Sequence, residues 1–249
     1  MSTFLLMAKA GGSGEAPENT CEAIRRAALL QAPNGTELGI EVDLRLSAES
    51  EFVAFHDARL ERTTNGQGAV RRRTVRQLRL LKAGPGGERI PTLAEVLEAA
   101  GDRPLLLELQ DNDVAAATAL TRDLTRIPRH RRELLWVASE HVRVVKALRR
   151  LDPALRTAAT KHEAWAMLVL GRAGLSRFAP RGSVWIVPER HAGLQVITPG
   201  FVEDARSAGD AVWAFVVDDL ATLTRLRAWG VTGCVTTRPG RLAHALARF

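Results

Sequence analysis

The sequence predicts a single closed (β/α)8 barrel of the α/β class, in which eight parallel strands alternate with helices. The chain has 249 residues, of which 46% are hydrophobic and 25% charged. This length supports one sizeable core, and α/β barrels commonly contain about 250 residues in one domain. Short apolar runs alternate with longer amphipathic stretches along the whole chain, which is typical of strands joined by crossover helices. An open, doubly wound sheet is the alternative, but no Gly-x-Gly-x-x-Gly sequence opens a helix here.

Eight apolar runs are expected to form the strands of the barrel. They are residues 4–8, 39–46, 105–110, 134–138, 156–160, 184–187, 212–217 and 233–236. Helix start signals lie between these runs. Thr20 or Asn19 precedes the first amphipathic stretch, and Thr92 and Glu95 have the spacing of a capping box.

One connection departs from this alternation. We expect a single domain, residues 1–249, with a small insertion at about 47–90, between the second and third barrel strands. A connection of this length without a full crossover helix usually has a function of its own or forms a subdomain. It contains an arginine-rich stretch from Arg71 to Arg79. This stretch is either a solvent-exposed face of the insertion, which we favour, or a phosphate-binding patch.

The formal charge of +7 arises from arginine. The chain has 35 basic residues, and only Lys9, Lys82, Lys146 and Lys161 are lysines, so the other 31 are arginines. A basic surplus favours attraction to anions, but it carries no information about specificity. No helix-turn-helix, zinc-finger or aromatic-rich RNA-binding motif accompanies it. Nucleic acid is therefore not an expected partner.

The cysteines and the apolar segments indicate the cellular compartment. Cys21 and Cys234 lie far apart and have no metal-site spacing, so free thiols in a reducing compartment are expected. The apolar run at residues 4–8 is too short for the core of a signal peptide. No stretch approaches the ~18 apolar residues of a membrane span. We therefore expect a cytoplasmic protein without integral membrane association.

Three acidic residues are predicted to meet at one end of the barrel. Active sites of such barrels lie at the carboxyl ends of the strands. Glu41 and Asp43 are two positions apart on a predicted strand and share one face, while Glu108 interrupts an apolar run. Three like charges repel in a low-dielectric interior unless a cation compensates them. Either Mg²⁺ or Ca²⁺ takes such oxygen ligands, or Arg45 or another basic residue pairs with the acids.

Two further segments are candidates for the site. Residues 11–14 are rich in glycine, and residues 17–20 open the next helix. Backbone N–H groups near a helix start are expected to bind an anion there. His56-Asp57 places a titratable pair within the insertion. Each of these signals is weak alone.

Taken together, five segments resemble the glycerophosphodiester phosphodiesterase family in order and spacing. They are residues 8–20, Glu41-x-Asp43, residues 56–64 beginning with His56-Asp57, residues 90–97 beginning with Ile90-Pro91-Thr92, and Leu107-Glu108-Leu109. A fainter likeness continues through Ser139, residues 212–219 and residues 230–239, so it covers essentially the whole chain. The resemblance implies a TIM barrel of lipid metabolism. It also implies an enzyme that cleaves a small phosphodiester to an alcohol and a phosphomonoester. The resemblance further implies that this enzyme uses a divalent metal held by two glutamates and an aspartate.

The resemblance assigns individual positions. It implies that Glu41, Asp43 and Glu108 bind the metal, Mg²⁺ or Ca²⁺, and that His56 is one of two acid/base histidines. The family's His-Arg-Gly is replaced here by Lys9-Ala10-Gly11, so the second histidine and a phosphate-binding arginine are missing. We assign Lys9 to catalysis and substrate binding. A protonated Lys9 would hold a phosphate oxygen, whereas burial that lowered its pKa would let it transfer a proton.

Other departures lie around the same predicted site. Gln110 replaces a lysine that usually follows the third-strand glutamate by two positions, and Phe215 replaces a tryptophan near the seventh strand. Thr237 stands where the family commonly has an aspartate. We expect Gly11, Gln110 and Phe215 to contact the substrate.

Two main hypotheses follow. The first is a metal-dependent hydrolase of a glycerophosphodiester or a related phosphodiester, with a phospholipase D-like lyase as a minor alternative. The second is a barrel that binds a phosphorylated ligand but is catalytically impaired or has been recruited to other chemistry. The loss of the family's residues at positions 9 and 10 motivates this second hypothesis.

Overall fold

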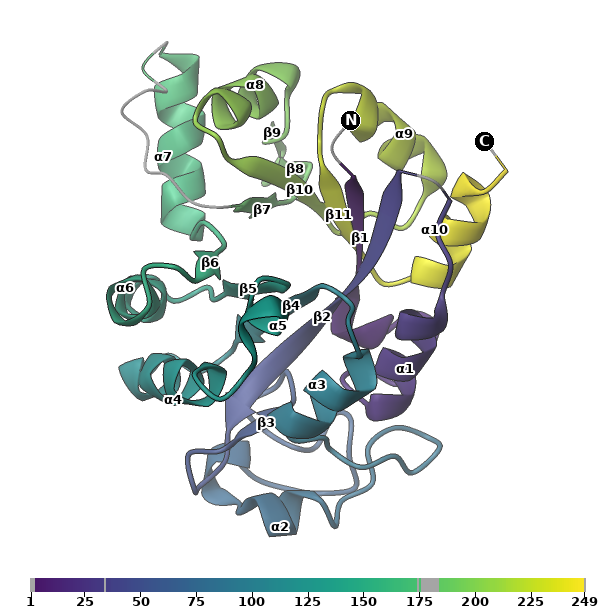
Figure 1. Ribbon diagram of the computed structural model, residues 1–249, viewed down its shortest axis with the longest axis vertical. Helices are drawn as coiled ribbons and strands as arrows, with labels where there is room; N and C mark the ends of the chain where they lie inside the picture. The colour runs from purple at the N-terminus through teal and green to yellow at the C-terminus, as the bar shows by residue number, and fades with distance from the viewer. Residues whose placement is uncertain (1–2, 34, 174, 176–183, 249) are drawn as a thin grey trace.

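The computed structural model describes residues 3–33, 35–173, 175 and 184–248. Eight parallel strands surround a common axis, in the order β6-β5-β4-β2-β1-β11-β10-β7 (Figure 1). They are β1 (Phe4–Ala8), β2 (Thr36–Leu46), β4 (Leu105–Leu109), β5 (Leu135–Ala138), β6 (Arg156–Thr157), β7 (Val184–Val187), β10 (Ala211–Phe215) and β11 (Gly233–Thr236). A parallel bridge between Ala158 and Val184 joins the two ends of this order. The predicted (β/α)8 barrel is confirmed.

Helices follow the strands and cover the outside of the barrel (Figure 1). They are α1 (Cys21–Leu29), α2 (Val75–Leu78), α3 (Leu93–Ala100), α4 (Val114–Leu124), α5 (Arg129–Arg132), α6 (Val142–Leu151), α7 (Lys161–Arg172), α8 (Pro199–Ser207), α9 (Leu220–Ala228) and α10 (Pro239–Leu246), with short 3-10 turns η1 (Lys9–Gly11) and η2 (Val70–Arg72). Thr20 caps α1, and Thr92 with Glu95 forms the predicted capping box of α3. Of the two predicted cap residues of α1, Thr20 is therefore the correct one.

Some predicted strand ends differ from the structure. β2 begins at Thr36, three residues before the predicted start, because its first residues pair with β1. The fifth run ends at Thr157, since Thr160 instead caps α7. A small antiparallel pair, β8 (Arg190–His191) and β9 (Leu194–Gln195), follows β7 and was not predicted.

The barrel interior is filled by one face of the strands. Alternate residues of a strand point to opposite faces, so one set packs inward and the other packs against the helices. The inward apolar cluster contains Leu5, Met7, Leu106, Ala158, Val184, Trp213 and Val235. Gly39 makes room for this packing, because a Cβ at this position would lie 2.3 Å from the Sδ of Met7. The same inward face carries three acidic residues nearer the carboxyl end of the barrel, namely Glu41, Asp43 and Glu108.

The insertion at 47–90 carries its own small apolar cluster. Its strand β3 (Phe52–Ala54) pairs antiparallel with the end of β2, at the lower edge of Figure 1. The cluster consists of Val53, Phe55, Leu60, Val70, Leu78, Ala83 and Ile90. Arg71, Arg72, Arg73 and Arg76 are exposed on this insertion, which agrees with the interpretation of a solvated face.

Cys21 and Cys234 are both free, as predicted. Within the described ranges, none of the helices combines the length and the apolar character needed to cross a bilayer.

Candidate active site

The three predicted carboxylates meet at the carboxyl end of the barrel. Glu41 and Asp43 lie on β2, and the parallel register places Asp43 opposite Glu108 of β4. One carboxylate oxygen from each residue lies within 4.8 Å of the others. Glu41 and Asp43 are only 2% and 1% exposed. Alternate residues of β2 share one face, and the register of β2 with β4 adds Glu108. The result is an acidic cluster that is largely buried from solvent.

This acidic cluster fits a divalent cation. The buried Oε1 of Glu41 has no hydrogen-bond partner among the described residues. Burial and the nearby Asp43 raise the pKa of Glu41 well above its usual range, and they raise the pKa of Glu108 to about 7. Oxygens that share one Mg²⁺ or Ca²⁺ lie roughly 3–5 Å apart. A cation among the three side chains would therefore satisfy the unpartnered oxygen and offset their repulsion.

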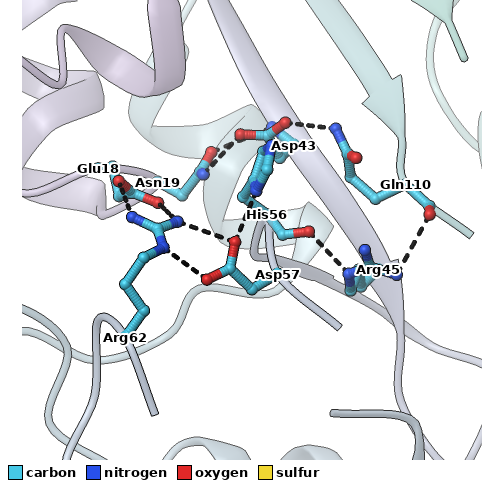
Figure 2. Close-up of polar contacts among 8 residues, drawn as sticks. All are labelled: Glu18, Asn19, Asp43, Arg45, His56, Asp57, Arg62 and Gln110. Atoms are coloured by element: carbon cyan, nitrogen blue, oxygen red, sulfur yellow. Dashed lines mark hydrogen bonds and ion pairs between the residues drawn. The ribbon is translucent and has the colours of Figure 1, made fainter. Parts of the chain in front are cut away.

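Arg45 does not pair with this cluster, so the alternative is wrong for Arg45. Its Nη1 lies 3.3 Å from Asp111 Oδ1, and its Nε donates a hydrogen bond of 2.8 Å to the carbonyl of His56. Nη1 also donates to the carbonyl of Gln110 (Figure 2). Arg45 thus ties β2 to the segments that follow β3 and β4.

Lys9 supplies a positive charge close to the acidic cluster. It is the first residue of η1, directly after β1, and its Nζ lies 5.5 Å from the centroid of the Phe215 ring. Burial lowers the pKa of Lys9, but the charges of the three carboxylates outweigh this effect and the pKa is raised. The direction of this shift favours the electrostatic role of Lys9 over proton transfer.

Two amide side chains hold Asp43 in one orientation. Asn19 Nδ2 donates a hydrogen bond of 2.8 Å to Asp43 Oδ2, and its Oδ1 accepts one of 3.0 Å from the Asp43 N–H. Gln110 Nε2 donates one of 2.6 Å to Asp43 Oδ1 (Figure 2). From the sequence, Asn19 was expected only at a helix start and Gln110 only in contact with substrate. The hydrogen bonds of these two side chains with Asp43 were not predicted.

The pairing of the insertion with β2 determines the position of His56. The N–H of Phe55 donates a hydrogen bond of 2.9 Å to the carbonyl of Asp43, which places His56 beside the end of β2. Its side chain is 47% exposed, and its Nδ1 lies 2.7 Å from Asp57 Oδ1. The imidazole is thus partly exposed, and its Nδ1 is held by a carboxylate.

Arg62 links this carboxylate to the segment after β1. Its Nε and Nη2 donate to the two oxygens of Asp57, at 2.5 Å and 3.0 Å. Nη1 and Nη2 donate to the two oxygens of Glu18 (Figure 2). The hydrogen bond from Arg62 lowers the pKa of Asp57 to about 2, so Asp57 is ionised beside His56. The sequence did not predict this bridge, because Glu18 and Arg62 are 44 positions apart.

Three amides of the glycine-rich stretch are not open to an anion. The N–H groups of Gly12 and Ser13 donate to the carbonyl of Lys9, and that of Gly14 donates to the carbonyl of Thr237. These amides are therefore engaged within the fold. Gly11 adopts φ +78°, and a Cβ there would lie 2.8 Å from the Cβ of Ala23. The structure thus gives Gly11 a packing role, and its contact with substrate stays a prediction.

A cavity of about 340 Å³ opens beside the acidic cluster. Glu41 and Glu108 line one part of it, and Phe215 lies in its wall. Lys9, His56 and Gln110 are not among its lining residues. The predicted residues therefore surround the acidic cluster from several sides, and only Phe215 of the predicted substrate contacts reaches the cavity.

Comparison with known proteins agrees with this geometry. Residues 10–241 match the glycerophosphoryl diester phosphodiesterase family. A glycerophosphodiester phosphodiesterase of Caldanaerobacter subterraneus is 27% identical, over 98% of both chains. The crystal structure of a glycerophosphodiester phosphodiesterase from Agrobacterium tumefaciens is 26% identical, with a TM-score of 0.75 over 98% of this chain and 100% of that chain.

A further solved structure has the same fold. It is a phosphodiesterase from Oleispira antarctica in complex with the product sn-glycerol-3-phosphate. The two chains are 23% identical, with a TM-score of 0.78 over 97% of this chain and 96% of that chain. Because the family match extends over nearly the whole barrel and includes the acidic cluster, the chain belongs to the glycerophosphoryl diester phosphodiesterase family.

Proposed function

We propose that this protein hydrolyses a glycerophosphodiester, or a related small phosphodiester, to an alcohol and a phosphomonoester with the help of Mg²⁺ or Ca²⁺. The observation that carries the proposal is the acidic cluster, with its buried and unpartnered Glu41 oxygen. The names of the relatives support the reaction class. The sn-glycerol-3-phosphate held by the Oleispira protein supports a small-molecule phosphate ligand.

Glu41, Asp43 and Glu108 would hold the ion. When bound, a divalent ion supplies Lewis-acid polarisation of a phosphoryl oxygen. The surrounding residues orient the ligands: the N–H of Ala10 donates a hydrogen bond of 2.6 Å to Glu41 Oε2, and the two amides described above hold Asp43. Such partners fix the direction of the coordinating oxygens before substrate binds.

Lys9 and His56 act on the substrate itself. The protonated Lys9 would donate a hydrogen bond to a phosphate oxygen and offset the charge that develops there. Ionised Asp57 accepts a hydrogen bond from Nδ1 of His56, so Nε2 is the nitrogen that takes up or gives a proton. A missing acid/base group costs about 10²- to 10⁴-fold in rate. Because one of the family's two histidines is absent, we expect turnover that is slow for the family.

The proposal is tested by following phosphorus-31 resonances during incubation with glycerophosphocholine or glycerophosphoethanolamine. We expect sn-glycerol-3-phosphate to appear with Mg²⁺, Ca²⁺ or Mn²⁺ and not with a chelator. The rate should fall about 100-fold or more in His56→Asn and stay unchanged in His130→Asn, which alters an exposed histidine of α5.

Each alternative has its own signature in this assay. A rate that is independent of metal or untouched by His56→Asn contradicts the proposal. A cyclic phosphate product would indicate the phospholipase D-like lyase. Ligand binding without turnover would indicate the catalytically impaired barrel.

A further inference from the structure

The cavity beside the acidic cluster has a largely apolar wall. Its volume of about 340 Å³ lies within the usual range for small-molecule sites. The apolar lining residues include Leu106 and Val235 of the barrel strands, Ile186 of β7, and Leu168 of α7. Four alanines, Ala138, Ala158, Ala159 and Ala164, also line it. The short side chains of these alanines leave the space open.

The charges in the outer part of this wall form one pair. Glu41 and Glu108 belong to the acidic cluster, and the other ionised pair that lines the cavity is Glu140 with Lys161. These two side chains form an ion pair with each other. The remaining titratable lining residue among the described ones, His191, packs edge-on against Trp165 with 6.0 Å between ring centroids. Among the described lining residues, the outer wall therefore offers no unpaired carboxylate to a cationic head group such as choline.

The apolar surface continues from the cavity to solvent. Trp165 and Phe215 both line the cavity, yet they are 41% and 37% exposed. Val169, one helical turn from Trp165 on α7, is 61% exposed, and Leu194 of β9 is 44% exposed. Exposed apolar side chains of this size mark binding sites when they gather at one place. Trp165 and Phe215 thus provide an apolar exit for a chain that is longer than the cavity.

We propose that this cavity accommodates an apolar group joined to the substrate phosphate, so that the substrate is a phosphodiester with an alkyl or acyl chain. The inference rests on the proposed function, which places the phosphate beside Glu41 and Glu108 at one end of the cavity. A group attached to that phosphate then extends along Leu106 and Ile186 toward Trp165. Transfer of each methylene from water to this wall favours binding roughly fourfold.

The apolar group has two possible positions in a phosphodiester, and two substrate series distinguish them. In the first series, sn-glycerol-3-phosphate is esterified with ethanol, butanol, hexanol or octanol, which places the chain on the leaving alcohol. In the second, glycerophosphocholine is compared with its 1-butanoyl and 1-hexanoyl derivatives, which place the chain on the glycerol. All are used below their micellar concentrations. We expect kcat/KM to rise roughly fourfold per methylene in one series, and flat profiles in both series overturn the inference.

A cavity-filling variant tests whether this wall is responsible. Ala164→Leu places a larger side chain in the cavity, whereas Ala166→Leu makes the same change two positions away on α7, outside the lining. We expect Ala164→Leu to abolish the gain with chain length while glycerophosphocholine is hydrolysed within about threefold of the original rate. Ala166→Leu should keep the gain. If Ala164→Leu does not fold, Trp165→Ser replaces it, and an unchanged chain-length dependence in the variant overturns the inference.

A binding measurement separates this inference from the proposed function. Calorimetric titration with inorganic phosphate, butyl phosphate and hexyl phosphate in Mg²⁺ should show affinity that rises with chain length. The heat-capacity change should become more negative along the same series, because apolar burial on binding has that effect. Chain-dependent binding without hydrolysis of any diester overturns the proposed function and supports the cavity assignment. Hydrolysis without chain dependence in rate or binding overturns the cavity assignment alone.

Discussion

Gln110 Nε2 donates a hydrogen bond of 2.6 Å to Asp43 Oδ1, at the point where β2 and β4 end side by side. Asn19 holds the other oxygen, so the Asp43 carboxylate has one orientation. Gln110 stands where the family resemblance leads one to expect lysine, and a neutral amide adds no positive charge. If the proposed metal binds, the acidic cluster would therefore depend more strongly on it, with Lys9 as the nearby positive side chain.

The first prediction concerns this hydrogen bond. Gln110→Ala should weaken the binding of Mg²⁺ or Mn²⁺ by about tenfold or more, because loss of a group that orients a ligand typically costs 10- to 100-fold. The measurement is the metal concentration that gives half-maximal diesterase rate. Gln67→Ala, an exposed change in the insertion, is the control. Equal metal requirements in the two variants would show that Gln110 does not orient Asp43.

The second prediction concerns Lys9. Lys9→Met should lower kcat/KM by about 10²- to 10³-fold, because a preorganised charge next to the reacting phosphate is worth roughly 3–4 kcal/mol of barrier. Lys9→Arg should recover part of this loss, since it restores the charge with a different geometry. Lys146→Met removes an exposed lysine of α6 and should have no effect. If Lys9→Met retained full activity, the electrostatic role of Lys9 would be refuted.

The third prediction concerns the glycine turn after β1. Gly11 and Gly68 both have positive φ, but only Gly11 faces a close neighbour, at 2.8 Å, while Gly68 faces open space. Gly11→Ala should therefore lower the free energy of unfolding by about 1–3 kcal/mol more than Gly68→Ala does. Urea unfolding of both variants measures the difference. Equal losses would mean that the packing of η1 on α1 adds nothing to the backbone strain.

The fourth prediction concerns the pH dependence that Asp57 contributes. Its pKa in the folded protein is about 2, below the ordinary value of 3.8, so the ionised form stabilises the fold above about pH 4. This contribution is lost as the pH falls from about 4 to 2. Asp57→Asn should cost of order 0.5–1 kcal/mol at pH 6, as for other solvent-accessible ion pairs, and much less at pH 2. A cost that stays the same at both pH values, or that Glu37→Gln reproduces, would contradict this account.

Much of the fold and the acidic cluster could be predicted because both depend on local periodicity. Glu41 and Asp43 share a face through the two-residue period of a strand. Glu108 joins them because parallel strands in a barrel end at the same edge. These relations follow from spacing along the chain, so no knowledge of long-range contacts is needed.

The rest depends on contacts between distant segments. Asn19 has φ +57° and reaches Asp43 across 24 positions, while Arg62 reaches Glu18 across 44. The apolar cavity arises where side chains of several strands and α7 meet, and no single segment carries its signature. The amides of Gly12, Ser13 and Gly14 donate to backbone carbonyls, and these partners are not visible in the sequence.

Calorimetric titration with Mn²⁺ tests most directly the claim that Glu41, Asp43 and Glu108 form one divalent-metal site. We predict one ion per chain for the unaltered protein, and affinity reduced at least 100-fold in Glu41→Gln. Glu37→Gln, at the opposite and exposed end of β2, should bind Mn²⁺ normally. Undiminished Mn²⁺ binding by Glu41→Gln, or no binding by the unaltered protein, would contradict the account.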